Sequence, residues 1–146
     1  MDYESFVLHT AIYENDVFIQ DTLSEYVVSL SRELGFLIKI HQYTRMPLNP
    51  QTLIKMCNYM NLVIINAEFD EKGISLCKEL LKQNRTLPVI LVSDENVVLD
   101  PILSLVGAIQ VPVDFETFRT LFHRAIGQLL CQRQIQSRKK KISNEE

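Results

Sequence analysis

LVIIN, residues 62–66, is an uninterrupted apolar run that ends in an asparagine and leads into the polar segment AEFDEKG, residues 67–73. A strand that is apolar on both faces is typical of the centre of a parallel sheet covered by helices on each side. In an open sheet of this kind, the residues at the carboxyl ends of the strands face the functional crevice. The run therefore predicts a central strand, and it places Asn66 where chemistry is expected.

Similar apolar runs lie on both sides of this strand. LPVILVS, residues 87–93, predicts a second central strand, while FVLHTAIY (6–13) and AIQV (108–111) predict two more. In LIKIHQY, residues 37–43, apolar and polar residues alternate, which indicates a half-exposed strand at a sheet edge. Five strands are expected.

Helical patterns separate these strands. Helices are predicted from apolar residues at three- and four-residue spacing, from capping residues and from glycines that end a helix. The predicted helices lie over 16–34, after Asn49-Pro50, over 74–84, over 101–106, and from Asp114 to about residue 136. Strands joined through helices imply right-handed crossovers and a parallel sheet. We expect one domain over residues 1–130 and a basic helical tail or linker over residues 131–146.

Charge is unevenly distributed along the chain. Residues 131–146 hold five Lys or Arg and two Glu, a balance of +3, so the overall charge of −3 leaves −6 on the remainder. An acidic body argues against nucleic-acid binding by the domain itself, and DNA contact is expected only through the tail or a further domain. The absence of a long apolar run and of a cationic start predicts a cytoplasmic protein with no membrane partner.

The cysteines and histidines suggest no metal site. Three cysteines are widely spaced without a CxxC motif, so buried or neutral free thiols are expected. His9 and His41 fall in strand patterns and His123 in a helix, and nothing in their spacing suggests ligands. We interpret all three histidines as structural.

Four segments together resemble the receiver domain of bacterial response regulators across residues 5 to 130. They are AIYEND (11–16), LVIINAEF (62–69), LPVILVS (87–93) and GAIQVPVDFETF (107–118). The longer stretch HTAIYENDVFIQDTLSEYV (9–27), together with GAIQVPVD (107–114), looks closest to receivers joined to LytTR-type DNA-binding domains. The resemblance implies an α/β, flavodoxin-like (βα)5 three-layer sandwich, with a parallel sheet in the order 2-1-3-4-5.

The chain departs from the family where phosphoryl transfer is performed. The phosphorylated aspartate of receivers is matched by Asn66, and an amide oxygen is a poor nucleophile. The family's lysine is matched by Val111, which cannot offset phosphoryl charge. The acidic pair that binds Mg²⁺ is reduced to Glu14-Asn15, with Asp16 next, whereas Ser93 is retained. We interpret the chain as a pseudo-receiver.

The degenerate phosphorylation pocket is therefore expected to comprise Glu14, Asn15, Asp16, Asn66, Ser93, Val111 and Pro112. No catalytic residue and no cofactor are predicted, and residual Mg²⁺ or Ca²⁺ binding would fall to Glu14, Asp16 and Asn66. Structural roles are the alternative to metal or phosphoryl binding. Asn66 and Ser93 would then be turn or cap residues, and Glu14 and Asp16 would be negative charges at a helix N-terminus. The resemblance also favours a cis bond between Val111 and Pro112.

These features predict a non-enzymatic regulatory module of a two-component-type, transcriptional regulator. It would act without phosphorylation, through a protein partner or as a homodimer that contacts through the last helix. Two alternatives remain open. One is a working receiver that uses another carboxylate, such as Asp70, with a divalent ion, and the other is a small-ligand sensor that uses the crevice.

Overall fold

The structure is a computed structural model that describes residues 7–46, 49–94 and 106–144, and the side chains as far as residue 132. Its elements in chain order are β1 (Val7–Tyr13), α1 (Val17–Leu34), β2 (Leu37–Tyr43), α2 (Pro50–Cys57), β3 (Leu62–Asn66), the 3-10 turn η2 (Phe69–Glu71), α3 (Gly73–Gln83), β4 (Val89–Ser93), β5 (Gly107–Gln110) and α4 (Phe115–Asn144). The helix predicted over 101–106 lies outside the described residues except for its last residue, Val106.

The five strands form one parallel sheet in the order β2-β1-β3-β4-β5. This confirms the predicted flavodoxin-like fold and the 2-1-3-4-5 order, with β2 at one edge. Register aligns the strand ends, because Tyr13 pairs with Ile65, Asn66 with Val92, and Ser93 with Gln110. The residues that end β1, β3, β4 and β5 therefore meet at one edge of the sheet.

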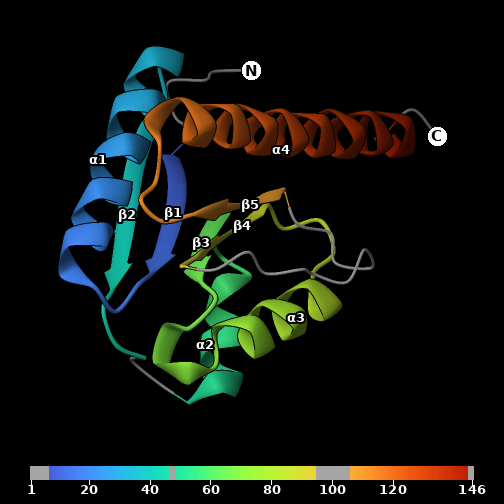
Figure 1. Cartoon of the computed structure of the whole chain (residues 1–146). Helices are drawn as coiled ribbons and strands as arrows, with labels where there is room; N and C mark the ends of the chain where they lie inside the picture. Colours follow the sequence, from blue (N-terminus) through green and yellow to red (C-terminus); the bar gives the residue numbers. More distant parts are fainter. Residues whose placement is uncertain (1–6, 47–48, 95–105, 145–146) are drawn as a thin grey trace.

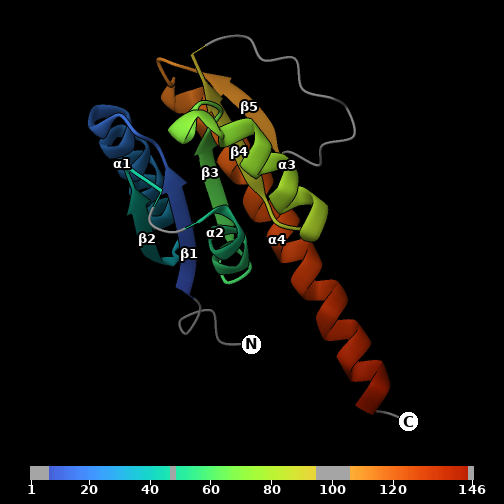
Figure 2. The ribbon, with the colours of Figure 1, turned by 90° about the horizontal axis from the view of Figure 1, so that it is seen from below.

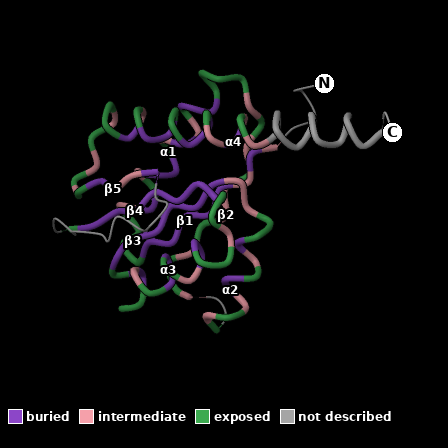
Figure 3. Tube along the Cα trace, turned by 90° about the vertical axis from the view of Figure 1, so that its right-hand side faces the viewer, coloured by how far each residue is buried: buried purple, intermediate pink, exposed green. Residues whose placement is uncertain are grey.

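Helices cover the sheet on both sides, as Figures 1 and 3 show. On one side, α1 and α4 contribute Leu23 and Phe122 to a core that also contains Ile64 of β3. On the other side, α2 and α3 contribute Leu53 and Leu80 to a second core. Every residue of β3 and β4 is buried, as their apolar runs predicted.

The helix ends follow the capping residues of the sequence. Asp16 caps α1, since its carboxylate accepts hydrogen bonds from the backbone N–H groups of Phe18 and Ile19. Gly35 ends α1 with a positive φ of 77°, a conformation that glycine adopts without steric cost. These contacts fix the direction in which the chain enters and leaves α1.

Helix α4 is the longest element, with 30 residues, and it projects past the sheet (Figure 2). Its buried residues Phe118, Leu121, Phe122, Ala125 and Leu129 share one face, as predicted. The amide of Gln132 donates to the carbonyl of Thr86, so contact with the domain continues beyond residue 130. None of the helices in the described ranges combines the length and apolarity required to cross a membrane. The division at residue 130 stays a prediction.

Candidate functional site at the strand ends

Glu14 and Asn66 lie side by side at the carboxyl ends of β1 and β3. The Asn66 amide nitrogen donates to Oε2 of Glu14 at 2.6 Å, and both side chains are buried. The other Glu14 oxygen accepts from the backbone N–H of Asp16 at 3.0 Å. We use the term strand-end site for Glu14, Asn66, Ser93 and Val111, the four predicted pocket residues on adjacent strands.

Burial raises the pKa of the Glu14 carboxyl, and the nearby carboxylates of Asp16 and Asp94 add to this effect. The hydrogen bonds from the Asp16 backbone and the Asn66 amide oppose the rise, because they stabilise the charged form. An aspartate in place of Asn66 would remove one of these donors and place a second negative charge against Glu14. The amide therefore suits a buried carboxylate that forms no ion pair with any side chain the structure describes.

Asn66 also shapes the loop that follows it. Its side-chain oxygen accepts from the backbone N–H of Glu68 at 2.7 Å, which is the structural role expected for a loop-capping asparagine. Both ends of the amide are therefore engaged in hydrogen bonds. In this arrangement Asn66 holds the loop and Glu14 together.

The structure separates the two residues that follow Glu14. Asp16 turns away to cap α1, which is the competing structural role anticipated from the sequence. Asn15 instead reaches the loop after β3, where it donates to Oδ1 of Asp70 and accepts from the Asp70 backbone N–H, each at 2.9 Å. The backbone N–H of Met46 donates to the second Asp70 oxygen. Three loops at this edge of the sheet are thus joined through Asn15 and Asp70.

The loop after β3 has an unusual backbone. Asp70 and Glu71 have positive φ values of 46° and 61°, a region that aspartate tolerates better than most residues. Gly73 then begins α3 directly beside Asn66. A Cβ atom at Gly73 would lie 2.6 Å from the carbonyl carbon and oxygen of Ala67, so only glycine fits there. The contact between Asn15 and Asp70, and the role of Gly73, were not predicted from the sequence.

Ser93 and Val111 complete the site on the β4 and β5 side. Ser93 is buried, and its carbonyl accepts from the backbone N–H of Val111 at 2.9 Å. The Val111 side chain packs against the core between the sheet and helices α1 and α4. The bond between Val111 and Pro112 is cis, as expected. Pro112 itself is exposed.

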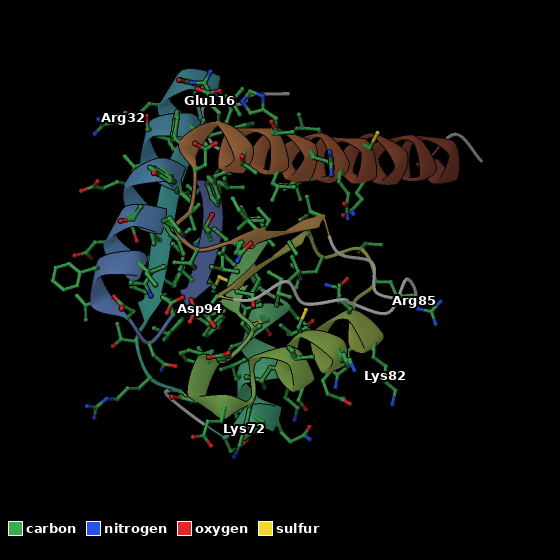
Figure 4. The ribbon with its side chains drawn as sticks, viewed as in Figure 1. Arg32, Lys72, Lys82, Arg85, Asp94 and Glu116 are labelled. Carbon is green, nitrogen blue, oxygen red and sulfur yellow. The ribbon has the colours of Figure 1, made fainter. Side chains whose placement is uncertain are left out.

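The strand-end site is rich in oxygen atoms and poor in cations. In Figure 4, Lys72 lies at the start of α3, Lys82 on it and Arg85 just after it, and all three are away from Asp94 at the end of β4. Across the described ranges, the ion pairs join Arg119 to Glu33 and Glu116, on helices α1 and α4. No group of three or more His, Cys, Asp or Glu side chains suited to a metal ion was found among the same residues.

The family model described as flagellar regulatory protein FleQ matches residues 34–126, which include Asn66, Ser93 and Val111. The chain belongs to the FleQ family. The match covers more than half of the chain and begins at the last residue of α1, so Glu14, Asn15 and Asp16 lie outside it. No curated protein matched the chain.

Solved structures with the same fold include response-regulator receivers. One is a response regulator receiver domain protein from Clostridium thermocellum, with 13% sequence identity, a TM-score of 0.66, and coverage of 83% of this chain and 95% of that one. Another is the BeF3-activated N-terminal receiver domain of Klebsiella pneumoniae RstA, with 16% identity, a TM-score of 0.59, and coverage of 83% and 97%. At these identities the likeness establishes the fold.

This FleQ-family chain is therefore a receiver-like regulatory domain, which confirms the coarser part of the resemblance. The closeness to LytTR-type receivers stays a prediction. The small-ligand alternative also stays a prediction. Two surface hollows lie beside α1 and at the start of α3, and neither is lined by Glu14, Ser93 or Val111.

Proposed function

We propose that this FleQ-family domain is a non-enzymatic signalling module that works without phosphorylation. It regulates a transcription regulator of the two-component type by contact with a protein partner or with a second copy of itself. The description of its family, flagellar regulatory protein, supports a role in flagellar regulation.

The contact between Glu14 and Asn66 carries this proposal. Formation of an acyl phosphate requires a carboxylate nucleophile, and the residue at the end of β3 is an amide that already donates to Glu14 at 2.6 Å. Transfer also requires a cation close to the developing phosphoryl charge, and Val111 offers an apolar side chain that packs into the core. Two separate parts of the reaction are therefore replaced by residues with structural roles.

The environment of Asp70 argues against its use as a substitute phosphoacceptor. One of its carboxylate oxygens accepts from the Asn15 amide and the other from the backbone N–H of Met46. Phosphorylation of either oxygen would break a hydrogen bond that joins two loops. A phosphoacceptor needs a free oxygen aligned for in-line attack, and here both oxygens are engaged.

The test is incubation with acetyl phosphate or phosphoramidate and Mg²⁺, followed by intact-mass measurement. We expect no phosphoryl group on the wild-type chain, and none on the Asn66→Asp variant, because the cation is still missing. The double variant Asn66→Asp with Val111→Lys provides the comparison in which both missing parts are supplied. Uptake of one phosphoryl group by the wild-type chain would refute the proposal. Loss of that uptake in Asp70→Asn would then establish the alternative receiver.

Self-association is tested separately, through the length of α4. The helix runs unbroken from Phe115 to Asn144, and the sequence places Ile135 on it, beyond Leu129, the last α4 residue that the structure describes as buried. An apolar residue on a projecting helix is suited to contact with a second copy. Sedimentation velocity should show a concentration-dependent dimer that Ile135→Lys weakens, while Gln136→Lys adds the same charge and leaves the dimer intact. A monomer at all concentrations would favour a heterologous partner.

A further inference from the structure

Two histidines meet across the strands β1 and β2. Nδ1 of His9 lies 3.2 Å from Nε2 of His41, and the ring centroids are 5.5 Å apart. Side chains alternate along a strand, so both rings lie on the side of the sheet that also holds Tyr13 and Tyr43. Both residues are half-buried and so remain reachable from solvent. The sequence had suggested only separate structural roles for them.

The backbone that carries the pair is held in place. Parallel pairing sets Ala11 opposite His41 and Lys39 opposite His9. The His9 backbone N–H donates to the side-chain oxygen of Asn61 at 2.8 Å, and the His9 carbonyl accepts from the Asn61 backbone N–H at 2.8 Å. The rings are therefore brought together by the sheet register, and a ligand that binds them need not order the chain first.

The spacing of the two nitrogens suits a shared metal ion. Zinc lies about 2.0–2.1 Å from imidazole nitrogen in tetrahedral sites, which separates two such nitrogens by about 3.3–3.4 Å. The observed separation is 3.2 Å. One of the facing nitrogens carries the proton of their hydrogen bond. Transfer of that proton to the outer nitrogen of the same ring leaves two lone pairs, and rotation of both rings directs them to one ion.

The electrostatic surroundings decide which ion and how tightly it binds. Only the neutral form of an imidazole ring binds a metal ion, so binding at this pair is expected to weaken in acid. Lys39 faces His9 in the register and weakens cation binding, although its side chain is exposed and flexible. Imidazole suits Zn²⁺, Ni²⁺ and Cu²⁺ better than Mg²⁺ or Ca²⁺.

We propose that His9 and His41 form a two-histidine binding site for a divalent transition-metal ion, with Zn²⁺ as the reference ion and water in the remaining coordination positions. The site lies on β1 and β2 and includes none of the strand-end residues. It is therefore independent of the proposed function. Because the pair supplies two protein ligands to one ion, we expect one ion per chain.

The experiment uses the untagged full chain with Cys131→Ser, because the exposed Cys131 thiol would otherwise compete for metal. Zinc is titrated against a metallochromic indicator. We expect one saturable site, at least tenfold weaker binding in His9→Gln and His41→Gln, and unchanged binding in His123→Gln, whose histidine is exposed on α4. Absence of saturable binding below millimolar zinc, or full binding by His41→Gln, would overturn the proposal.

A second measurement does not depend on the folding of the variants. The imidazole resonances of the Cys131→Ser chain are followed by NMR during the zinc titration. His9 and His41 must shift together and saturate at one ion per chain, while His123 stays unchanged. Equal shifts of all three histidines would show nonspecific binding and would refute the site.

Discussion

The two halves of the strand-end site depart from the receiver sequence pattern in different ways. On the β1 and β3 side, Asn66 replaces a charged group with a neutral one that donates to Glu14 at 2.6 Å. On the β4 and β5 side, Val111 contributes an apolar side chain to the core, and its backbone bonds to Ser93. The first half is a buried polar network, whereas the side chain of Val111 in the second half belongs to the packing.

The comparison predicts that stability depends more on the β1 and β3 half. In that half, the buried Glu14 carboxylate is bonded to the buried Asn66 amide. The backbone beside Asn66 leaves no space for a side chain at Gly73. In the other half, the half-buried Val111 side chain packs at the margin of a large core. Substitution at such a position lowers the free energy of unfolding only slightly.

The largest effect is expected for Gly73→Ala. A methyl group there would lie 2.6 Å from the carbonyl carbon and oxygen of Ala67, and backbone atoms at the end of a central strand cannot move aside easily. We expect the free energy of unfolding, measured by urea denaturation, to fall by about 3 kcal/mol or more. Gly127→Ala is the matched control, since a Cβ at Gly127 in α4 meets nothing within 4 Å.

The control should raise stability by about 0.5–1 kcal/mol, because alanine favours a helix more than glycine does. Equal effects of the two substitutions would mean that the β3–α3 loop is not constrained as described. A Gly73→Ala chain that does not fold would agree with the prediction, provided that the Gly127→Ala chain folds.

The second effect in size is expected for Asn66→Asp. The substitution removes the amide donor to Glu14 and sets two carboxylates against each other in a buried site. We expect a loss of about 2 kcal/mol at pH 7 in urea denaturation, in the range for a broken buried hydrogen bond with an unpaired charge. The loss should shrink in acid, where the two carboxylates share a proton.

Val111→Lys is the comparison from the other half, and it should cost less than Asn66→Asp, since a lysine stem can cover the same apolar surface. In the double variant a positive charge is added at the same end of the sheet as the new carboxylate, so part of the Asn66→Asp loss should be recovered. If the two single substitutions destabilise equally, the two halves do not differ as proposed.

Glu14 should give the chain a pH-dependent stability. Burial raises its pKa above the ordinary value of 4.5, so between 4.5 and the folded-state pKa the folded chain binds more protons than the unfolded chain. The Glu14 contribution to stability is therefore greatest in acid and falls as the pH rises through this window. In Glu14→Gln that fall should disappear.

The measurement is the free energy of unfolding of wild type and variant at several pH values between 4 and 8. Glu68→Gln is the matched control, because it removes an exposed carboxylate from the neighbouring loop. The control should keep the wild-type slope. A Glu14→Gln chain with the same slope as wild type would contradict the description of a buried carboxylate.

Much of the fold follows from local sequence patterns. Single segments are enough to predict several elements: the buried runs of β3 and β4, the alternation of β2, and the caps Asp16 and Gly35 of α1. Each pattern is compatible with few other local structures. The strand order needed the resemblance, since nothing local in the sequence states which parallel strands are neighbours. The inner face of α3 was not specified in the same way, and there Ile74 is half-buried while Leu76 is buried.

The candidate site was predicted only in part. Asn66, Glu14, Ser93 and Val111 lie together because they end adjacent strands, which is a consequence of topology. Asn15 and Asp70 are 55 positions apart and meet through a loop with two positive φ values, and side-chain periodicity carries no signal for such loops. The glycine at position 73, directly after a polar loop, was the one available sign of a close backbone approach.

The smallest effect is expected for Asn15→Ala, which tests whether the network of the β1 and β3 half extends into the exposed loops. The substitution removes two hydrogen bonds with Asp70 and one with the Thr44 carbonyl, but water replaces them at an exposed site. Urea denaturation should show a loss of about 0.5–1 kcal/mol, less than for a buried hydrogen bond. Hydrogen exchange should be faster at the Asp70 amide, which the Asn15 oxygen protects, and unchanged at Glu68, which Asn66 holds. Faster exchange at both amides would mean that the loop opens as one unit and that the buried and exposed parts of the network are not separable.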